Sequence, residues 1–226
     1  MADKEDEHTP GLLGQLKEAF VGRKMARAER GHLLTGEADE AHKKRLPPGQ
    51  RLVENWPVLD LGIQPTVTAD QWTLDINGHV ANPVKWDYAT LQAQPRHDQV
   101  CDIHCVTAWS RYDNHFEGVS TAHILDLVKP TPSVTHVIFH AYDGYTTNVT
   151  LDAFAAPDAM IAHSWNGSPL TREHGGPVRM VLPQWYFWKS AKWIKRIEFV
   201  DADQPGFWEV RGYHNEGDPW LEERYS

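Results

Sequence analysis

Two patterns of apolar residues divide this chain near residue 45. Over residues 1–45, apolar side chains recur at roughly helical spacing with basic side chains between them. This pattern predicts a partly helical N-terminal extension that packs on its own domain or on a partner. The apolar side chains concerned are Leu12, Leu13, Leu16, Ala19, Phe20 and Met25. The run Leu46-Pro47-Pro48-Gly49-Gln50 then marks the start of a folded body, residues 46–226.

In the body the pattern is mostly that of strands and turns. Apolar and polar residues alternate through residues 72–77, and the dipeptide Asn77-Gly78 is typical of a hairpin turn. Asp143-Gly144 is predicted to join a strand at Val134–His140 to a second one at Tyr145–Leu151. Further strands are predicted at Val178–Leu182, Lys192–Val200 and Trp208–Tyr213.

The helical signals are short. One helix is predicted within Asp87–Gln94, and another over His123–Val128 with Ser120 or Thr121 as its cap. Strands therefore dominate without regular βαβ alternation, which indicates an α+β domain built on mixed sheets. The glycines form neither GxGxxG nor a phosphate loop, so the usual nucleotide-binding signatures are absent from the sequence.

Charge and hydropathy exclude two classes of partner. The formal net charge of −9 argues against nucleic acid, because phosphate binding needs a concentrated basic surface. No run approaches the ~20 apolar residues that a membrane-spanning helix needs. The first ten residues, MADKEDEHTP, lack the basic start and apolar run of an export signal. We therefore expect a cytoplasmic protein with no membrane span.

The stretch Val100–Ser110 holds both cysteines of the chain, Cys101 and Cys105, together with His104. Three interpretations are open from the residues alone. A zinc site needs four ligands, and this stretch supplies three without a second ligand pair elsewhere. A Cys/His nucleophile needs an orienting third group, which nothing marks. Otherwise each cysteine is a small buried hydrophobic residue.

A second stretch, Asn166–Lys195, concentrates fixed hydrogen-bond donors. A Gly-Gly-Pro turn follows His174, and Arg179 lies on the strand predicted after it. Lys189, Lys192 and Lys195 follow in a tryptophan-rich loop. Such a set suits a phosphate or another anion. The alternative is that Arg179 pairs with a carboxylate and the lysines form a solvated face.

These two stretches resemble the sulfite oxidase-type molybdopterin enzymes. HCVTAWS at 104–110 is similar to their molybdenum-ligand segment, and NGSPLTREHGGPVRMVLP at 166–183 to their cofactor-clamping segment. The similarity continues in the same order through PPGQRLVENWPVLDLG at 47–62, FEGVS at 116–120 and YFWKSAKWIKRIE at 186–198. It is strongest to small bacterial members without a haem domain, which are related to the catalytic subunit of a periplasmic methionine-sulfoxide reductase. The resemblance implies their mixed-sheet molybdopterin-binding fold.

The resemblance also implies roles for individual residues. Cys105 occupies the position of the thiolate bound to molybdenum, and Cys101 matches no ligand position. His104 adjoins the ligand and would hydrogen-bond the cofactor or the metal's oxygen ligand, the alternative being a histidine satisfied within the fold. Arg111, His163 and Trp165 are candidates for the substrate side. The implied cofactor contacts are Asn55, Trp56, His104, Ala141, His174, Arg179, Ser190, Ala191 and Lys192.

The implied activity is a molybdenum-dependent oxidoreductase that transfers an oxygen atom, with two electrons, to or from a small substrate. The implied cofactor is molybdopterin with molybdenum. No haem-binding CxxCH and no iron–sulfur cysteine set is present, so the sequence predicts neither haem nor a nucleotide cofactor but a separate electron-transfer partner. The alternatives are a non-catalytic binding module on the same fold, or a zinc-dependent hydrolase using Cys101, His104 and Cys105.

Overall fold

The computed structural model describes residues 45–226. The predicted helical extension therefore lies outside the described residues, except for Arg45 at its end. Two β-sheets make up most of the regular structure in the described part, and the helices between them are short. This arrangement confirms the predicted α+β class with mixed sheets.

The first sheet is built on a long hairpin. Strand β4 (His97–Cys105) pairs antiparallel with β5 (Trp109–Ser120), and β5 pairs on its other side with β8 (Met160–Trp165). Three short strands complete the sheet. They are β1 (Arg51–Leu52), which runs parallel to β5, and β9 (Ser168–Pro169) and β10 (Arg179–Val181), which pair with β8.

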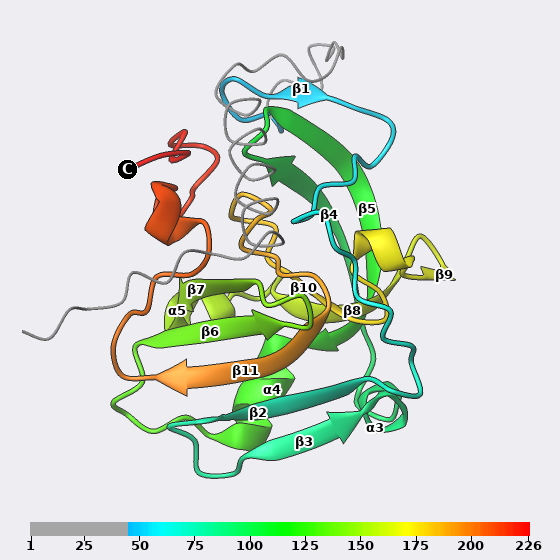
Figure 1. The fold of residues 1–226 in the computed structure, drawn as a ribbon, viewed down its shortest axis with the longest axis vertical. Helices are drawn as coiled ribbons and strands as arrows, with labels where there is room; N and C mark the ends of the chain where they lie inside the picture. The colour runs from blue at the N-terminus through cyan, green and yellow to red at the C-terminus, as the bar shows by residue number, and fades with distance from the viewer. Residues whose placement is uncertain (1–44) are drawn as a thin grey trace, which may run out of the picture.

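The second sheet has five strands in the order β3-β2-β11-β6-β7. Its strands are β2 (Thr73–Gly78), β3 (Val84–Asp87), β6 (His136–Ala141), β7 (Thr146–Thr150) and β11 (Ile194–Val200). Only the pairing of β2 with β11 is parallel. Figure 1 shows this sheet across the lower half of the molecule, with β4 and β5 rising above it.

Three α-helices in the described part begin at a side-chain cap. Asp87 caps α3 (Tyr88–Gln92), Ser120 caps α4 (Thr121–Val128) and Thr150 caps α5 (Leu151–Phe154), each by accepting a backbone N–H of the first turn. The first two confirm the predicted helices. Single 3₁₀ turns follow at η1 (Arg172–His174) and η2 (Glu209–Arg211). None of the helices within residues 45–226 is long and apolar enough to cross a membrane.

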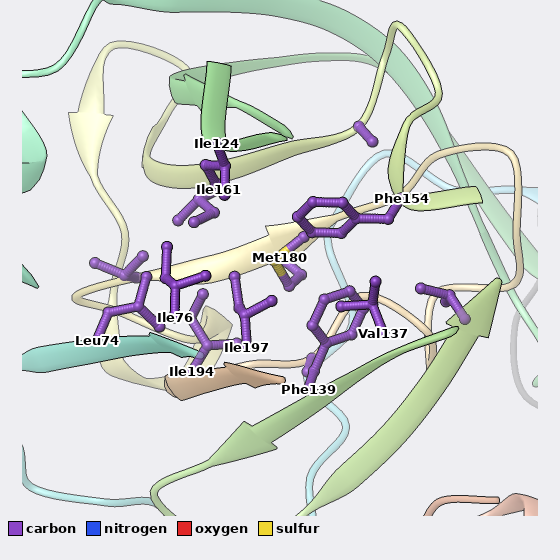
Figure 2. Packing of buried hydrophobic residues seen from close by; sticks show 14 of the residues in the cluster. Leu74, Ile76, Ile124, Val137, Phe139, Phe154, Ile161, Met180, Ile194 and Ile197 are labelled. Atoms are coloured by element: carbon purple, nitrogen blue, oxygen red, sulfur yellow. The ribbon is translucent and has the colours of Figure 1, made fainter. Parts of the chain in front are cut away.

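The main hydrophobic core fills the space between the two sheets. Leu74, Ile76 and Ile197 project from the second sheet toward Ile161 and Met180 of the first, and all five side chains are fully buried (Figure 2). A second cluster surrounds the end of the β4–β5 hairpin and includes Cys105. The second cluster leads directly to the candidate site.

Three local predictions from the sequence are wrong. Trp208–Tyr213 forms the 3₁₀ turn η2 and its flanks, because Val210, Arg211 and Gly212 bond back to residues three or four positions earlier. Asn77-Gly78 ends strand β2 instead of forming the turn, which follows it. The strand predicted over Lys192–Val200 begins only at Ile194, and a β-bulge between Ile194 and Arg196 shifts its register with β6.

A candidate cofactor cavity around Cys105

The turn between β4 and β5 fixes Cys105. Cys105 ends β4 opposite Trp109, and its carbonyl accepts hydrogen bonds from the Ala108 N–H (3.0 Å) and from the Gln50 side chain (3.0 Å). Ala108 adopts a positive φ of 67°, which closes the turn. The Cys105 Sγ lies 3.1 Å from the Thr107 Oγ1, and the cysteine is 6% exposed. A thiol is thus held in one place inside the protein.

The Cys105 side chain opens into a cavity of about 290 Å³. The residues that line this cavity fall within six segments of the chain: 56–61, 105–109, 143–145, 174–179, 187–193 and 208–213. They come from the segment after β1, the β4–β5 turn of the first sheet, the β6–β7 turn of the second, the segment from η1 to β10, and the irregular segments on either side of β11. Segments distant in the sequence therefore meet at one site, as expected of a cofactor pocket.

Arg179 makes one part of the cavity cationic. Its side chain is 2% exposed and donates to the carbonyls of His174 (2.8 Å), Ser190 (2.8 Å) and Met180 (3.2 Å). Among residues 45–226 no carboxylate pairs with it, so the alternative of an Arg179–carboxylate pair fails there. Burial lowers the pKa of Arg179 to about 9, which leaves it charged at neutral pH. A buried cation without a counter-ion favours an anionic ligand.

Lys192 brings a second cation to the same cavity. Its Nζ donates to the Glu173 carbonyl (2.6 Å) and lies over the Trp193 ring. Gly175, with a φ of 103°, packs between the two cations, and a Cβ there would lie 3.0 Å from the Lys192 side chain and 3.1 Å from the Arg179 Cβ. The glycine turn is therefore what allows Lys192 and Arg179 to approach each other.

Ser190 and Ala191 also line the cavity, as predicted. The Ser190 Oγ accepts the Leu182 N–H (2.9 Å), and the backbone N–H groups of Ser190 and Ala191 bond to the carbonyls of Phe187 and Lys189. Lys189 does not line it. Its Nζ pairs instead with Glu209 (2.7 Å) and donates to the Asn148 carbonyl (2.9 Å), fully buried. Lys189 thus anchors the loop from behind.

Aromatic rings form the walls. Trp56 stacks on His174 with a centroid distance of 4.1 Å and an interplanar angle of 8°, and it packs against Phe187. Burial, with Arg179, Lys192 and Arg111 nearby, lowers the pKa of His174 to about 4, so the imidazole is neutral at pH 7. Flat walls beside two cations suit a planar anionic group.

Four predicted site residues lie outside this cavity. The His104 ring faces away from it, bonding the Ser110 Oγ (2.7 Å) and approaching Trp220, and burial lowers its pKa to about 4. Asn55 is exposed, and Ala141 is buried in the main core. Arg111 bonds the Glu54 carbonyl and Asn114. His104 directly precedes Cys105 on strand β4, where successive side chains point to opposite faces, and Asn55 directly precedes Trp56.

The three residues predicted on the substrate side, Arg111, His163 and Trp165, differ in position. Trp165 packs edge-on against Trp56 (4.9 Å) and stands 5.9 Å from the His174 ring, so it supports the cavity wall from outside. Arg111 lies over the Trp165 ring at 4.8 Å and belongs to the same outer layer. His163 lines a separate groove beside Tyr88.

The described residues do not support the zinc alternative. Cys101, His104 and Cys105 do not converge on one point, and burial raises the pKa of the Cys101 thiol to about 12. The one group of possible metal ligands within residues 45–226 is Asp98, His115 and Glu117. Arg96 bridges the two carboxylates of that group on the surface, so it needs no cation.

Sequence reasoning missed several cavity residues. Asp143 and Tyr145 flank the turn glycine between β6 and β7, and Asp60, Trp208 and Tyr213 come from irregular segments. The predicted hairpin at Asp143-Gly144 could have indicated the first two, because Ala141, one of the implied cofactor contacts, lies just before that turn. Asp60 lies within the segment 47–62 that resembles the family, and nothing in the local sequence marks Trp208 and Tyr213.

The geometry agrees with a comparison against known families. A family described as the oxidoreductase molybdopterin binding domain matches residues 61–208. The chain belongs to this family. Members bind molybdopterin, and the cavity fits such a group, with buried cations for a phosphate, flat aromatic walls for a ring system and a thiol for a soft metal.

Individual proteins that resemble this chain support the same family assignment. The chain is 43% identical over 183 residues, 80% of this chain and 92% of the relative, to an uncharacterized oxidoreductase, YuiH, of Bacillus subtilis. It is 31% identical over 155 residues to the catalytic subunit of the protein-methionine-sulfoxide reductase MsrP of Gluconobacter oxydans, covering 61% of this chain and 49% of the relative. The chain thus spans about half the length of such reductase subunits.

A solved structure shares the fold. The sulfane dehydrogenase SoxCD from Paracoccus pantotrophus superimposes with a TM-score of 0.57 at 20% identity, over 79% of this chain and 58% of that one. This match confirms the sulfite oxidase-type fold expected from the sequence.

Proposed function

We propose that this chain is a molybdenum-dependent oxidoreductase that transfers an oxygen atom to or from a small substrate, with Cys105 as the protein ligand of the metal. One observation carries the proposal: the Cys105 thiol and the buried Arg179 guanidinium line the same cavity. A thiolate is a soft donor that suits molybdenum, and the cation suits the phosphate of molybdopterin.

The chain's own residues would hold the cofactor at its two ends. Arg179 and Lys192 would neutralise the phosphate, and the loop at Ser190 and Ala191 would close around it. Trp56 and His174 would flank the ring system. His174 is neutral at pH 7, so it can donate one hydrogen bond and accept another without adding charge.

When bound, the cofactor supplies the two-electron change that oxygen-atom transfer requires. The protein's contribution is to position and to exclude water. Thr107 lies at hydrogen-bond distance from the Cys105 sulfur and would tune its electron donation. Leu59, Leu61 and Trp208 line the cavity with apolar surface and limit the access of water.

The substrate we favour is an uncharged sulfoxide. Arg179 and Lys192 are committed to the phosphate, and Arg111, the remaining candidate for an anionic substrate such as sulfite, does not line the cavity. The apolar lining at Val58, Leu59 and Leu61 suits a thioether or sulfoxide side chain. The methionine-sulfoxide reductase subunits among the relatives support the same class.

Metal analysis of purified protein tests the proposal. The chain is expressed in a host that makes molybdopterin, and molybdenum and zinc are measured per chain. We expect about one molybdenum per chain, and turnover of methionine sulfoxide with reduced viologen as electron donor. A protein that carries neither molybdenum nor pterin would be a binding module, and one that carries zinc alone would revive the hydrolase alternative.

A second arm addresses the substrate. The same loaded protein is assayed at matched substrate concentrations, with reduced viologen as electron donor for methionine sulfoxide and trimethylamine N-oxide and with ferricyanide as electron acceptor for sulfite. We expect the highest kcat/KM for the sulfoxide. Faster turnover of sulfite would leave the cofactor assignment intact and refute the proposed substrate class.

A further inference from the structure

The C-terminal segment presents an exposed aromatic residue. Of the ten tryptophans of the chain, only Trp220 is exposed, at 48%, and the next residue, Leu221, is 70% exposed. An indole and a leucine side by side at the surface bury little of their apolar area within the described molecule. This segment lies beyond the family match, which ends at residue 208.

The loop that carries Trp220 is firmly held. A bridge between Tyr213 and Tyr225 closes it. The Asp218 carboxylate accepts the N–H of Trp220 (2.7 Å), and the Glu223 carboxylate accepts the N–H of Asp218 (3.0 Å). These hydrogen bonds fix the backbone at the tip of the loop, so the Trp220 side chain is held at the surface by an ordered backbone.

The same loop is bonded to the turn that carries Cys105. Arg224 donates to the Val106 carbonyl (2.5 Å), one residue after the cysteine. On the other side, the Trp220 ring approaches the His104 ring at a centroid distance of 6.2 Å, and His104 precedes the cysteine. Only one buried imidazole therefore separates the exposed indole from the backbone of Cys105.

Acidic side chains surround this apolar tip. Between residues 214 and 224 the chain carries Glu216, Asp218, Glu222 and Glu223 against a single arginine, Arg224. Glu216 and Glu222 are exposed. Arg224 is itself engaged with the Val106 carbonyl and with Glu222. The surface around Trp220 is thus apolar at its centre and negative at its rim, which is the arrangement of a specific docking patch.

We propose that Trp220 and Leu221 form the docking patch for a one-electron carrier protein whose redox group is ringed by basic side chains. The inference rests on the proposed function, because turnover requires two electrons and the chain carries no haem or iron–sulfur motif. For the favoured sulfoxide reduction the carrier would supply the two electrons in two single-electron exchanges, so two carrier molecules would be oxidised for each sulfoxide reduced, and the reaction with a ferric carrier would be the reverse of one such exchange.

The test uses a cationic haem protein, cytochrome c, as the carrier. Holoenzyme is reduced with reduced viologen, and its oxidation by ferric cytochrome c is followed by stopped flow. Cytochrome c with acetylated lysines, which has lost the basic rim, is the matched probe. Binding of cytochrome c to the cofactor-free protein, measured by calorimetry at low salt, gives a readout that does not depend on turnover.

Two variants remove the patch separately: Trp220→Ala and the more exposed Leu221→Ser. Neither residue lines the Cys105 cavity. Val100→Ser, at an exposed apolar position on β4 (61% exposed), is the control. We expect each patch variant to bind cytochrome c more weakly and to react with it about tenfold more slowly, with an unchanged rate toward viologen. The control should match the wild type in all assays.

Each outcome is decisive. Equal rates with native and acetylated cytochrome c, or wild-type behaviour of both patch variants, would overturn the docking patch. A molybdenum-loaded wild type that does not exchange electrons with viologen would instead overturn the proposed function itself. Loss of the cytochrome reaction with retention of the viologen reaction supports the patch alone.

Discussion

At the scale of single residues, Arg179 carries the strongest indication of what the cavity binds. Folding places its guanidinium where water does not reach, and no carboxylate of residues 45–226 pairs with it. The three carbonyls that accept its hydrogen bonds orient the group without neutralising it. Burying a cation without a counter-ion destabilises the fold, and an anionic ligand in the cavity would compensate for this destabilisation.

Replacing Arg179 should therefore lower cofactor content first. In Arg179→Ala the phosphate loses a charged donor, which we expect to weaken cofactor binding by roughly 2–5 kcal/mol. Arg179→Lys keeps the charge but loses the forked geometry of the guanidinium. Its molybdenum content should lie between that of the wild type and that of Arg179→Ala. Molybdenum per chain after dialysis is the measurement. Full loading of purified Arg179→Ala would remove the residue from the phosphate site.

Cys105→Ser tests the metal ligand. Oxygen is a harder donor than sulfur, so we expect near-complete loss of turnover while the circular dichroism spectrum and the melting temperature of the fold stay close to those of the wild type. Cys101→Ser is the matched control, since Cys101 lies outside the cavity. Wild-type activity of Cys105→Ser, or equal losses in both variants, would contradict the assignment.

His174 gives a pH dependence with a definite sign. Its pKa is about 4 in the folded protein against 6.5 for an ordinary histidine, so between these values the unfolded chain binds a proton that the folded chain does not. Its contribution to stability is complete above pH 6.5 and is lost as the pH falls toward 4. In cofactor-free protein, His174→Gln should flatten the fall of the unfolding free energy by about 1.4 kcal/mol per pH unit within that window.

The control for this pH series is His79→Gln, at a surface histidine 47% exposed. Urea denaturation at pH 7 and pH 5 provides the measurement. A slope in His174→Gln equal to that of the wild type would mean that the imidazole is already protonated in the folded state.

At the scale of elements, the glycine turn after η1 joins the two cations of the cavity. In Gly175→Ala the new Cβ meets Lys192 and Arg179 and the backbone keeps an unfavourable φ of 103°. We expect a loss of roughly 1–2 kcal/mol from the conformation alone, together with lower molybdenum content. Gly144→Ala, with a φ of 82° and nothing within 4 Å, shares the strain without the contacts. Equal molybdenum content in the two variants would show that the contacts do not matter.

The elements also show what the sequence could reveal. The capped helices α3 and α4 and the β6–β7 hairpin follow from local signals that need no tertiary information. The β4–β5 hairpin was not predicted, because its buried positions include Ser110, Asn114 and Gly118, which interrupt the apolar alternation of a strand. Asn114 is satisfied there by Arg111, Trp165 and the Cys101 carbonyl, and two of these partners, Trp165 and Cys101, lie on other strands.

The residues of the candidate site were likewise predicted only in part. Cys105, Trp56, His174, Arg179, Ser190, Ala191 and Lys192 lie together as the family resemblance implied. Asn55, His104 and Ala141 are neighbours in sequence of residues at or near the cavity, but they point elsewhere. Side-chain direction depends on register, which a motif does not specify. The cytoplasmic location remains a prediction.

At the scale of the whole molecule, a buried ion pair joins three distant segments. Lys189 of the cavity loop bonds Glu209 of η2 and the Asn148 carbonyl of β7, and the Glu209 carboxylate also holds the Trp188 indole. Burial lowers the pKa of Lys189, while Glu209 opposes this shift. The pair therefore fixes the loop from behind the cavity.

Breaking this pair should be costly. Lys189→Met leaves the Glu209 carboxylate buried without its cation, and we expect a loss of about 3–5 kcal/mol in the free energy of unfolding. Lys85→Met, which removes the exposed pair with Asp75 at 3.6 Å, should change stability little. Thermal unfolding of the cofactor-free proteins compares them, and similar melting temperatures would refute the role of the buried pair.

The cavity lies against turns from both sheets, with Cys105 on one side and Asp143 and Tyr145 on the other. Any occupant therefore ties the two halves of the core together. A ligand present at a thousand times its Kd adds about 4 kcal/mol to the stability of its host. Chains made in cells starved of molybdate should then melt earlier and be degraded sooner, so that the abundance of this protein follows the trace-metal nutrition of its host.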